Sequence, residues 1–165
     1  MPVYKLYHKG ERNQPNAQPN PEVKAQLAQI LNKRISSNLI EQDTLERIII
    51  DSGGLLRELI RITNECCRIC LRLVRCQPEN KYIKINQDIL DEALNKFKLD
   101  FDSRIGVKNY EILKTTYEKN KPNDTKEQQF LDLLHGLYIL EYRNHELWYD
   151  VHPIVTKVLQ QKDII

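Results

Sequence analysis

A double glycine, Gly53-Gly54, stands directly before a long amphipathic stretch that ends near Cys76. Glycine reaches backbone angles that cost other residues energy, so the pair predicts that one helix stops here and another starts. Ser52 precedes the pair, and its hydroxyl is suited to accept hydrogen bonds from the free amides of a first helical turn. The sequence therefore predicts a junction between two helices, with Ser52 as the cap of a helix over residues 55–76.

Five arginines share one face of this helix, which we call the arginine face: Arg57, Arg61, Arg68, Arg72 and Arg75. At ~100° per residue they fall within an arc of about 60°, and at ~1.5 Å per residue they cover roughly 27 Å. Guanidinium groups bind phosphate or carboxylate in pairs, so the outer three are candidate contacts for phosphate or an acidic partner. The alternative is a solvated face whose arginines pair with Glu58, Glu65 and other acids. Arg57 differs because it lies in the first turn, from where it can be aimed at a neighbouring site.

The segment Ser52-Gly-Gly-Leu-Leu-Arg57 resembles the sensor-2 segment in the helical lid of AAA+-type P-loop ATPases. In that family an arginine at the start of a lid helix reaches the phosphates of the nucleotide bound on the ATPase core. The resemblance implies that Arg57 senses nucleotide, with Arg61 as a second candidate. It also implies an ATPase core as partner, in the same polypeptide or another chain, ATP or ADP as the ligand held with that core, and a possible oligomer.

The chain lacks the motifs of a catalytic core. None of its five glycines opens a P-loop, and no acidic Walker-B-like strand follows. No Ser-His-Asp or Cys-His pairing stands out either, so we expect a non-enzymatic chain that binds no cofactor by itself.

All four cysteines lie in or at the end of the helix over 55–76: Cys66, Cys67, Cys70 and Cys76. The spacing Cys67-x-x-Cys70 admits a metal or redox site. Metal sites usually draw their cysteines from turns or from several elements, however, and no histidine is near. We therefore expect no metal and predict that the cysteines pack in the core as small apolar residues.

The overall pattern predicts a mainly α fold in three parts. Residues 1–20 are interpreted as a short strand followed by a flexible, proline-containing linker. Residues 21–78 are interpreted as a lid-like subdomain, with helices over 21–34, 43–50 and 55–76 and with Asn20 capping the first. Residues 79–165 are interpreted as a winged-helix-like domain with three helices. The first is capped by Asn86, the second begins near Lys108 and the third is capped by Asp124. A hairpin over 137–151 then precedes a last short helix.

Three helices followed by a hairpin is the order expected of a winged helix, and residues 137–155 resemble the winged-helix ends that follow the lid in several ATPases. Such a domain reads DNA with its third helix and its wing, where the candidate contacts are Lys126, Gln128, Gln129, Arg143, Asn144 and His145. Glu127 and Asp132 would repel the phosphate backbone. A protein partner is therefore at least as strong an expectation as duplex DNA.

A net charge of +2 does not demand a nucleic-acid partner. No stretch approaches the ~20 apolar residues of a membrane span, and no secretory signal is evident, so we expect a cytoplasmic protein without a membrane partner. The leading hypothesis is a non-catalytic region of a P-loop ATPase that couples nucleotide state to partner or DNA engagement. The alternative is a free-standing winged-helix DNA-binding or regulatory protein with residues 1–76 as a partner-binding arm.

Overall fold

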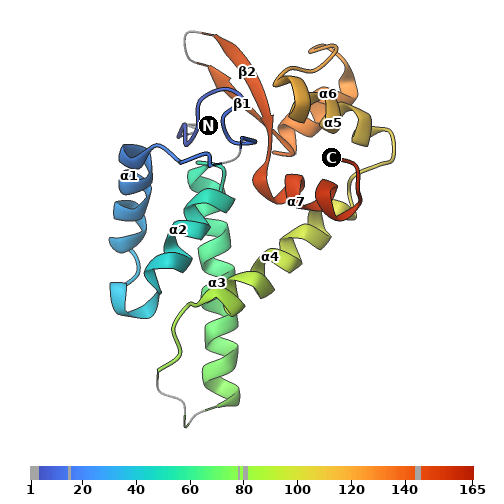
Figure 1. Cartoon of the computed structure of the whole chain (residues 1–165). Helices are drawn as coiled ribbons and strands as arrows, with labels where there is room; N and C mark the ends of the chain where they lie inside the picture. Colours follow the sequence, from blue (N-terminus) through green and yellow to red (C-terminus); the bar gives the residue numbers. More distant parts are fainter. Residues whose placement is uncertain (1–3, 15, 78, 80–81, 144–145) are drawn as a thin grey trace. The chain divides into compact units, whose positions relative to one another are not determined.

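The computed structural model describes residues 4–14, 16–77, 79, 82–143 and 146–165. The described chain is mainly helical, with one two-stranded antiparallel hairpin near its C-terminal end (Figure 1). This confirms the predicted fold class. The chain divides into two compact units. Unit 1 contains the described residues up to Leu6 together with Pro19–Lys96, and unit 2 contains Tyr7–Gln18 and Phe97–Ile165.

Unit 1 is built from helices α1 (Pro21–Asn32), α2 (Gln42–Asp51) and α3 (Leu56–Cys76), a 3-10 turn (Ser37–Leu39), and the first part of α4 (Gln87–Asp102). The predicted caps are present at two starts. The side chain of Asn20 accepts from the amides of α1, and Asn86 Oδ1 accepts from the amide of Ile89 at 3.1 Å. An isolated parallel bridge joins Ile40 and Ile85.

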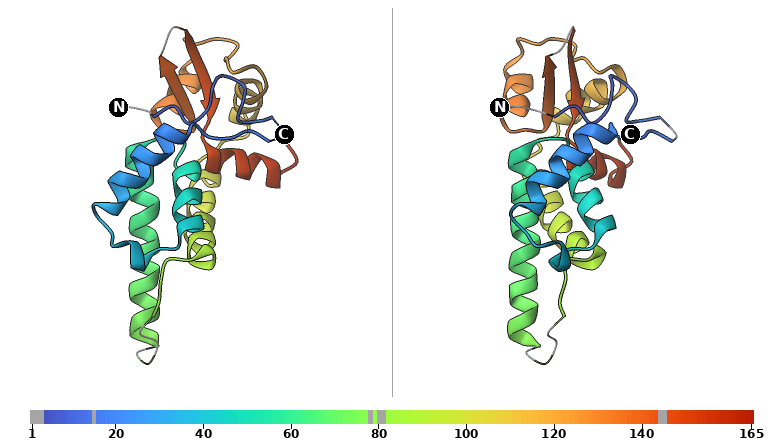
Figure 2. Two further views of the ribbon diagram at one scale, coloured as in Figure 1. Left: turned by 60° about the vertical axis from the view of Figure 1, so that its left-hand side comes forward. Right: turned by 90° about the vertical axis from the view of Figure 1, so that its left-hand side faces the viewer.

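The core of unit 1 lies where one side of each helix meets the others. Leu27 of α1, Ile48 of α2 and Leu59, Ile62 and Cys66 of α3 are fully buried. These positions recur at helical spacing, as the sequence predicts. The C-terminal turns of α3 extend past the ends of α1 and α2, and both further views show the same (Figures 1 and 2).

Unit 2 contains the end of α4, then α5 (Asn109–Lys119), α6 (Gln128–His135), β1 (Ile139–Arg143), β2 (Leu147–Val151) and α7 (Pro153–Gln161). The strands pair antiparallel with Glu141 opposite Tyr149, which confirms the predicted hairpin. Phe130 of α6 packs edge-on against Tyr149, with ring centroids 5.1 Å apart. Trp148 stacks on Tyr142 with ring centroids 4.1 Å apart, and both side chains are buried.

The N-terminal segment differs from the prediction. Residues 4–8 form no strand, and residues 2–3 lie outside the described residues. Residues 11–20 were expected to form a flexible linker; of the described ones, 11–14 and 16–18 belong to unit 2, with turns at 11–13 and 16. Arg12 in this segment pairs with Asp150 and its side chain is 14% exposed, a contact that local polarity does not reveal.

Two further differences concern helix boundaries. Helix α6 begins at Gln128 rather than after Asp124, because the Asp124 carboxylate accepts from the amide of Lys126 at 2.8 Å and forms a turn instead of a helix cap. The compact units divide between Lys96 and Phe97, inside α4, whereas the sequence places the boundary near residue 78.

Candidate functional site

The turn between α2 and α3 is fixed by its two glycines. Gly53 and Gly54 have φ angles of +63° and +77°, which other residues adopt only with strain. Gly54 also lies directly against the N-terminal chain: the amide of Tyr4 donates to its carbonyl at 2.8 Å. A Cβ on Gly54 would lie 1.9 Å from the carbonyl oxygen of Tyr4. The predicted helix break is therefore present, and a backbone contact explains the second glycine.

Ser52 does not cap α3, so that prediction was wrong. Helix α3 starts from Leu55, which makes no side-chain cap. The hydroxyl of Ser52 instead donates to the carbonyl of Ile49 at 2.6 Å and accepts from the amide of Gly54 at 3.3 Å. Two left-handed glycines separate Ser52 from the new helix, which leaves it at the end of α2.

Arg57 lies in the first turn of α3 and its side chain is exposed. Within the described part of the chain, no residue forms a hydrogen bond or ion pair with its guanidinium. The neighbouring Leu55 and Leu59 are buried at 1% and 0% exposure. Their packing fixes the helical turn from which the unpaired Arg57 guanidinium projects. A guanidinium in that setting can bind an oxyanion without first giving up a partner.

Arg61 is held by its own helix. Its Nη1 lies 3.0 Å from Glu58 Oε2, and the Glu58 side chain is 2% exposed. Removing the guanidinium from a buried carboxylate is costly, because the carboxylate would be left uncompensated. Arg61 is therefore less available than Arg57 to an outside ligand.

The outer arginines are partly paired. Arg68 Nη1 lies 3.4 Å from Glu65, which also receives Lys96 Nζ at 2.8 Å. Arg72 Nη2 lies 2.8 Å from both carboxylate oxygens of Glu92 on α4. Arg75 is exposed and forms no hydrogen bond or ion pair with any residue that the structure describes. The interpretation as a solvated, acid-paired face thus describes Arg68 and Arg72, whereas Arg75 remains available.

The four cysteines of α3 differ in burial. Cys66 is buried, and burial raises the pKa of its thiol to about 12. Burial also raises the pKa of Cys67 and Cys70, so none of the three thiols is activated as a thiolate. No group of metal-binding residues occurs in the described ranges. Only Cys66 packs in the core as predicted; Cys67 and Cys70 are half-buried and Cys76 is exposed, so the prediction was wrong for these three.

The surface predicted to contact DNA is only partly available. Lys126 is exposed, but Gln128 donates to Asp132 at 2.8 Å on the same helix face. Gln129 lines a groove between α5 and the start of α6, together with Lys108 and Glu111.

The wing adds little free positive charge. Arg143 Nε donates to Glu141 at 2.5 Å, and this hydrogen bond together with the carboxylate charge raises the pKa of the Arg143 guanidinium. Asn144 and His145 lie outside the described residues. The structure thus brings carboxylates to two of the predicted DNA-contacting side chains, Gln128 and Arg143, and these acids would repel phosphate.

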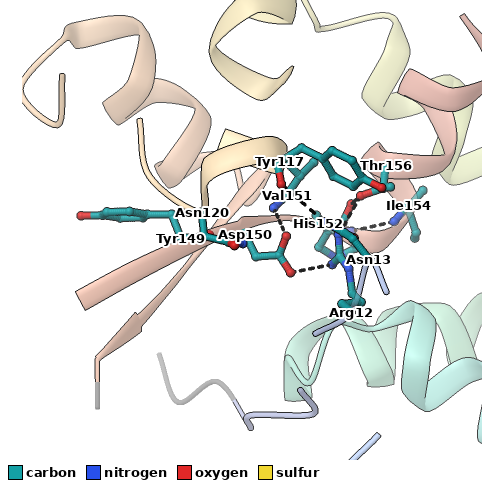
Figure 3. Close-up of polar contacts among 10 residues, drawn as sticks. All are labelled: Arg12, Asn13, Tyr117, Asn120, Tyr149, Asp150, Val151, His152, Ile154 and Thr156. Carbon is teal, nitrogen blue, oxygen red and sulfur yellow. Dashed lines mark hydrogen bonds and ion pairs between the residues drawn. The ribbon is translucent and has the colours of Figure 1, made fainter. Parts of the chain in front are cut away.

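Sequence reasoning missed a buried ion pair in unit 2. Arg12 Nη1 lies 3.2 Å from Asp150 Oδ2, with side-chain exposures of 14% and 7%. Arg12 Nη2 also donates to the hydroxyl of Thr156 at 2.9 Å, and Asp150 Oδ1 accepts from the amide of Val151 at 2.8 Å. Figure 3 shows Arg12 reaching from the N-terminal segment to β2 and α7.

The position of Asp150 in the sequence indicates a buried carboxylate that needs a partner. It is an acid within the apolar strand Leu147–Val151, and a buried carboxylate needs a cation or several donors. Burial raises the pKa of Asp150, and the nearby Arg12 and the Val151 amide counter that shift only in part. The sequence does not show which of the many distant cations would supply the partner.

Around the same pair, other contacts tie residues 7–14 to unit 2. Lys9 Nζ lies 3.0 Å from Glu146, and Asn13 Nδ2 donates to the carbonyl of Tyr117 at 3.4 Å. His152 is fully buried and caps α7, since its Nδ1 accepts from the amide of Ile154 at 3.2 Å (Figure 3). The cluster anchors residues 7–14 within unit 2.

No helix in the described ranges is both long enough and apolar enough to cross a membrane.

Comparisons with known proteins identify no relative of this chain. No family model, curated protein or solved structure matches the chain.

Proposed function

We propose that the chain is a non-catalytic lid and coupling region of a P-loop ATPase, in which Arg57 contacts the phosphates of a bound nucleotide. The catalytic core belongs to the same polypeptide or to a partner chain, and the ligand is ATP or ADP held mainly by that core. On this proposal the chain works in the cytoplasm. The proposal extends the resemblance of the segment from Ser52 to Arg57 to a sensor-2 motif.

The proposal rests on the exposure and the unpaired guanidinium of Arg57. It is the one residue of the arginine face that combines exposure, a position in the first turn of α3, and a guanidinium without a partner among the described residues. A phosphate needs such a donor, because an arginine already bound to a carboxylate must first break that pair. Arg61, held by Glu58, has a secondary role at most.

The coupling step follows from chain connectivity. A ligand shifts an equilibrium between two orientations only if it binds one of them more tightly. Nucleotide phosphates that attract Arg57 favour one orientation of α3 relative to the core. Helix α4 continues without a break from unit 1 into unit 2, and it can therefore transmit that movement to the α6–hairpin region.

Hydrogen exchange in the assembled ATPase tests this coupling. The intact assembly is compared with ATP and with ADP, and amide protection is followed across α3 and α6. We expect nucleotide-dependent protection in both helices. It should be lost in Arg57→Ala and retained in Arg34→Ala, which replaces an exposed arginine two residues beyond the end of α1. Unchanged protection differences in Arg57→Ala would contradict the proposal, as would a polypeptide and partner set without any P-loop.

A protein partner for the α6–hairpin region is favoured over DNA. Glu141 and Asp132 engage two of its candidate contacts, and each adds negative charge where phosphates would lie. A titration with duplex DNA at several salt concentrations distinguishes the alternatives. We expect no micromolar binding at physiological salt. Tight, steeply salt-dependent binding that is lost in Lys126→Glu but not in Lys33→Glu would instead support a free-standing winged-helix DNA-binding protein.

A further inference from the structure

The C-terminal half of α3 presents apolar side chains to solvent. Leu71 is 57% exposed and Val74 is 46% exposed, although aliphatic residues of this size are usually covered in a folded protein. They are three residues apart and therefore lie on the same side of the helix. This part of α3 extends beyond α1 and α2 (Figures 1 and 2), so those helices do not cover it.

Positive charge runs beside this apolar strip. On a helical wheel, Leu71 lies roughly 60° from Arg68 and about 40° from Arg75. The Arg68 side chain is 74% exposed and meets Glu65 only at 3.4 Å. Arg75 has no described partner. We call the surface formed by Arg68, Leu71, Val74 and Arg75 the α3 tail surface.

The local charge is one-sided. Residues 66–77 contain three arginines and no acid. Two acids beside this stretch are already engaged, since Glu65 binds Lys96 and Glu92 binds Arg72, and the next acid along the chain is Glu79. The α3 tail surface therefore attracts negative charge and offers an apolar edge alongside it.

We infer that the α3 tail surface binds an amphipathic helix of a partner protein, in which aliphatic residues are flanked by aspartate or glutamate. Helix-to-helix docking uses apolar anchors at i, i+3 and i+4, the spacing at which Leu71 and Val74 occur. Acidic side chains beside those anchors would reach Arg68 and Arg75, which sets orientation and speeds association. This inference does not depend on the proposed role of Arg57, which lies at the opposite end of α3.

Charge and shape disfavour the other occupants. A second copy packed through the same strip would bring arginine faces of like charge together. Duplex DNA would satisfy the arginines but leave Leu71 and Val74 uncovered. Anionic lipid would need a broader apolar face than these two large side chains supply.

Selection from a displayed library of helical peptides with randomised polar positions provides the probe. The full 165-residue chain is the bait, and enriched peptides are synthesised and titrated by fluorescence anisotropy. We expect acidic residues to flank the aliphatic anchors in the enriched sequences. Binding should weaken by about tenfold or more in Leu71→Glu and in the double variant Arg68→Glu/Arg75→Glu, and it should fall as salt rises.

Matched controls come from the same unit. Leu39→Glu replaces a leucine that is 50% exposed, and Arg34→Glu reverses another exposed arginine. Both should bind the selected peptides as the unchanged chain does. A peptide whose acids are replaced by lysine should bind Arg68→Glu/Arg75→Glu better than it binds the unchanged chain, which a merely unfolded variant cannot do.

Four results would overturn the inference. The first is enrichment without acidic residues, and the second is binding that Leu71→Glu leaves intact. The third is sedimentation showing that the chain self-associates through Leu71. The fourth is binding to a 20-base-pair duplex or to phosphatidylserine vesicles that depends on the same four side chains.

Discussion

At Asp150, burial and an ion pair act in opposite directions on one carboxyl group. Burial raises its pKa, while Arg12 and the Val151 amide lower it, and burial is the larger effect. A buried ion pair contributes little net stability if both partners are replaced together by apolar residues. Removal of one partner is different, because the other charge then remains buried without compensation.

Arg12→Ala should therefore destabilise unit 2 by about 3 kcal/mol, measured as the free energy of unfolding in urea. Lys9→Ala is the matched control, since Lys9 forms an ion pair from the same segment but with side chains 41% and 61% exposed. That control should cost about 0.5 kcal/mol or less. Equal effects of the two substitutions would show that the Arg12 pair is not buried in solution.

The pH dependence of stability has a defined sign at Asp150. Its pKa is raised in the folded state above the ordinary 3.8, so the folded protein binds this proton more tightly than the unfolded chain does. The stabilising contribution is present below pH 3.8 and is lost as pH rises through the folded-state pKa. Relative to Asp150→Asn, the unchanged chain should become less stable over that rise. A relative gain in stability would mean that Arg12 outweighs burial.

For single residues, the sequence predicts which side chains lie on the arginine face better than it predicts which of them are paired. The arginine face follows from helical periodicity, and most of these arginines are exposed. Whether Arg57 is free and Arg61 is held depends on Glu58 being buried, which only packing decides. The Arg12–Asp150 pair joins residues 138 positions apart, and no local pattern links them.

The α2–α3 turn depends on Gly54 for two separate reasons, a left-handed backbone and the close approach of Tyr4. Gly54→Ala should cost at least about 2 kcal/mol, because strain and steric overlap add. Gly53→Ala meets the conformational cost alone, about 1 kcal/mol. Gly106→Ala, where the nearest atom to the new Cβ is 3.9 Å away, should be nearly neutral. Thermal unfolding of the three variants checks this order, and equal losses for Gly54 and Gly53 would contradict the Tyr4 contact.

Helix boundaries were predictable where a local signal acts alone. Asn20 with Pro21, and Asn86, cap helices as predicted because side chain and amide are close in sequence. Ser52 and Asp124 carry the same signal but form turns instead. Two left-handed glycines follow Ser52, and Asp124 closes a local turn on Lys126, so in each case a competing hydrogen bond takes the capping group.

On the scale of the whole molecule, the N-terminal segment contributes to both compact units. Leu6 is 2% exposed in unit 1, and its carbonyl accepts from the amide of Asn20 at 2.7 Å. Arg12 is bound within unit 2. A chain that starts at residue 19 should therefore lose amide protection both at the α2–α3 turn and in the hairpin.

Hydrogen exchange measures that loss in each unit separately. Replacement of Gln14 and Asn16–Gln18 by glycine and serine is the control, since Arg12 and Leu6 remain in place. The control should retain most of the protection. Loss confined to one unit after truncation would show that the segment serves that unit alone.

The division into units was not predictable from composition. Residues 77–80 have the polar, proline-containing pattern of a linker, yet the units divide inside α4, between Lys96 and Phe97. Helix α4 supplies buried residues to both units, with Leu90 in unit 1 and Phe101 in unit 2. A helix that contributes to two cores shows one continuous apolar pattern, so the sequence contains no break at the boundary.

Nucleotide affinity of the proposed ATPase assembly tests the central claim, that Arg57 contacts nucleotide phosphate. Affinities for ATP and ADP are measured for the unchanged assembly, Arg57→Ala and Arg34→Ala. A charge-assisted hydrogen bond contributes ~1.5–3 kcal/mol, so Arg57→Ala should weaken ATP binding by roughly tenfold or more, while Arg34→Ala leaves it unchanged. Equal affinities of all three assemblies for both nucleotides would contradict the account and leave Arg57 as a solvated surface residue.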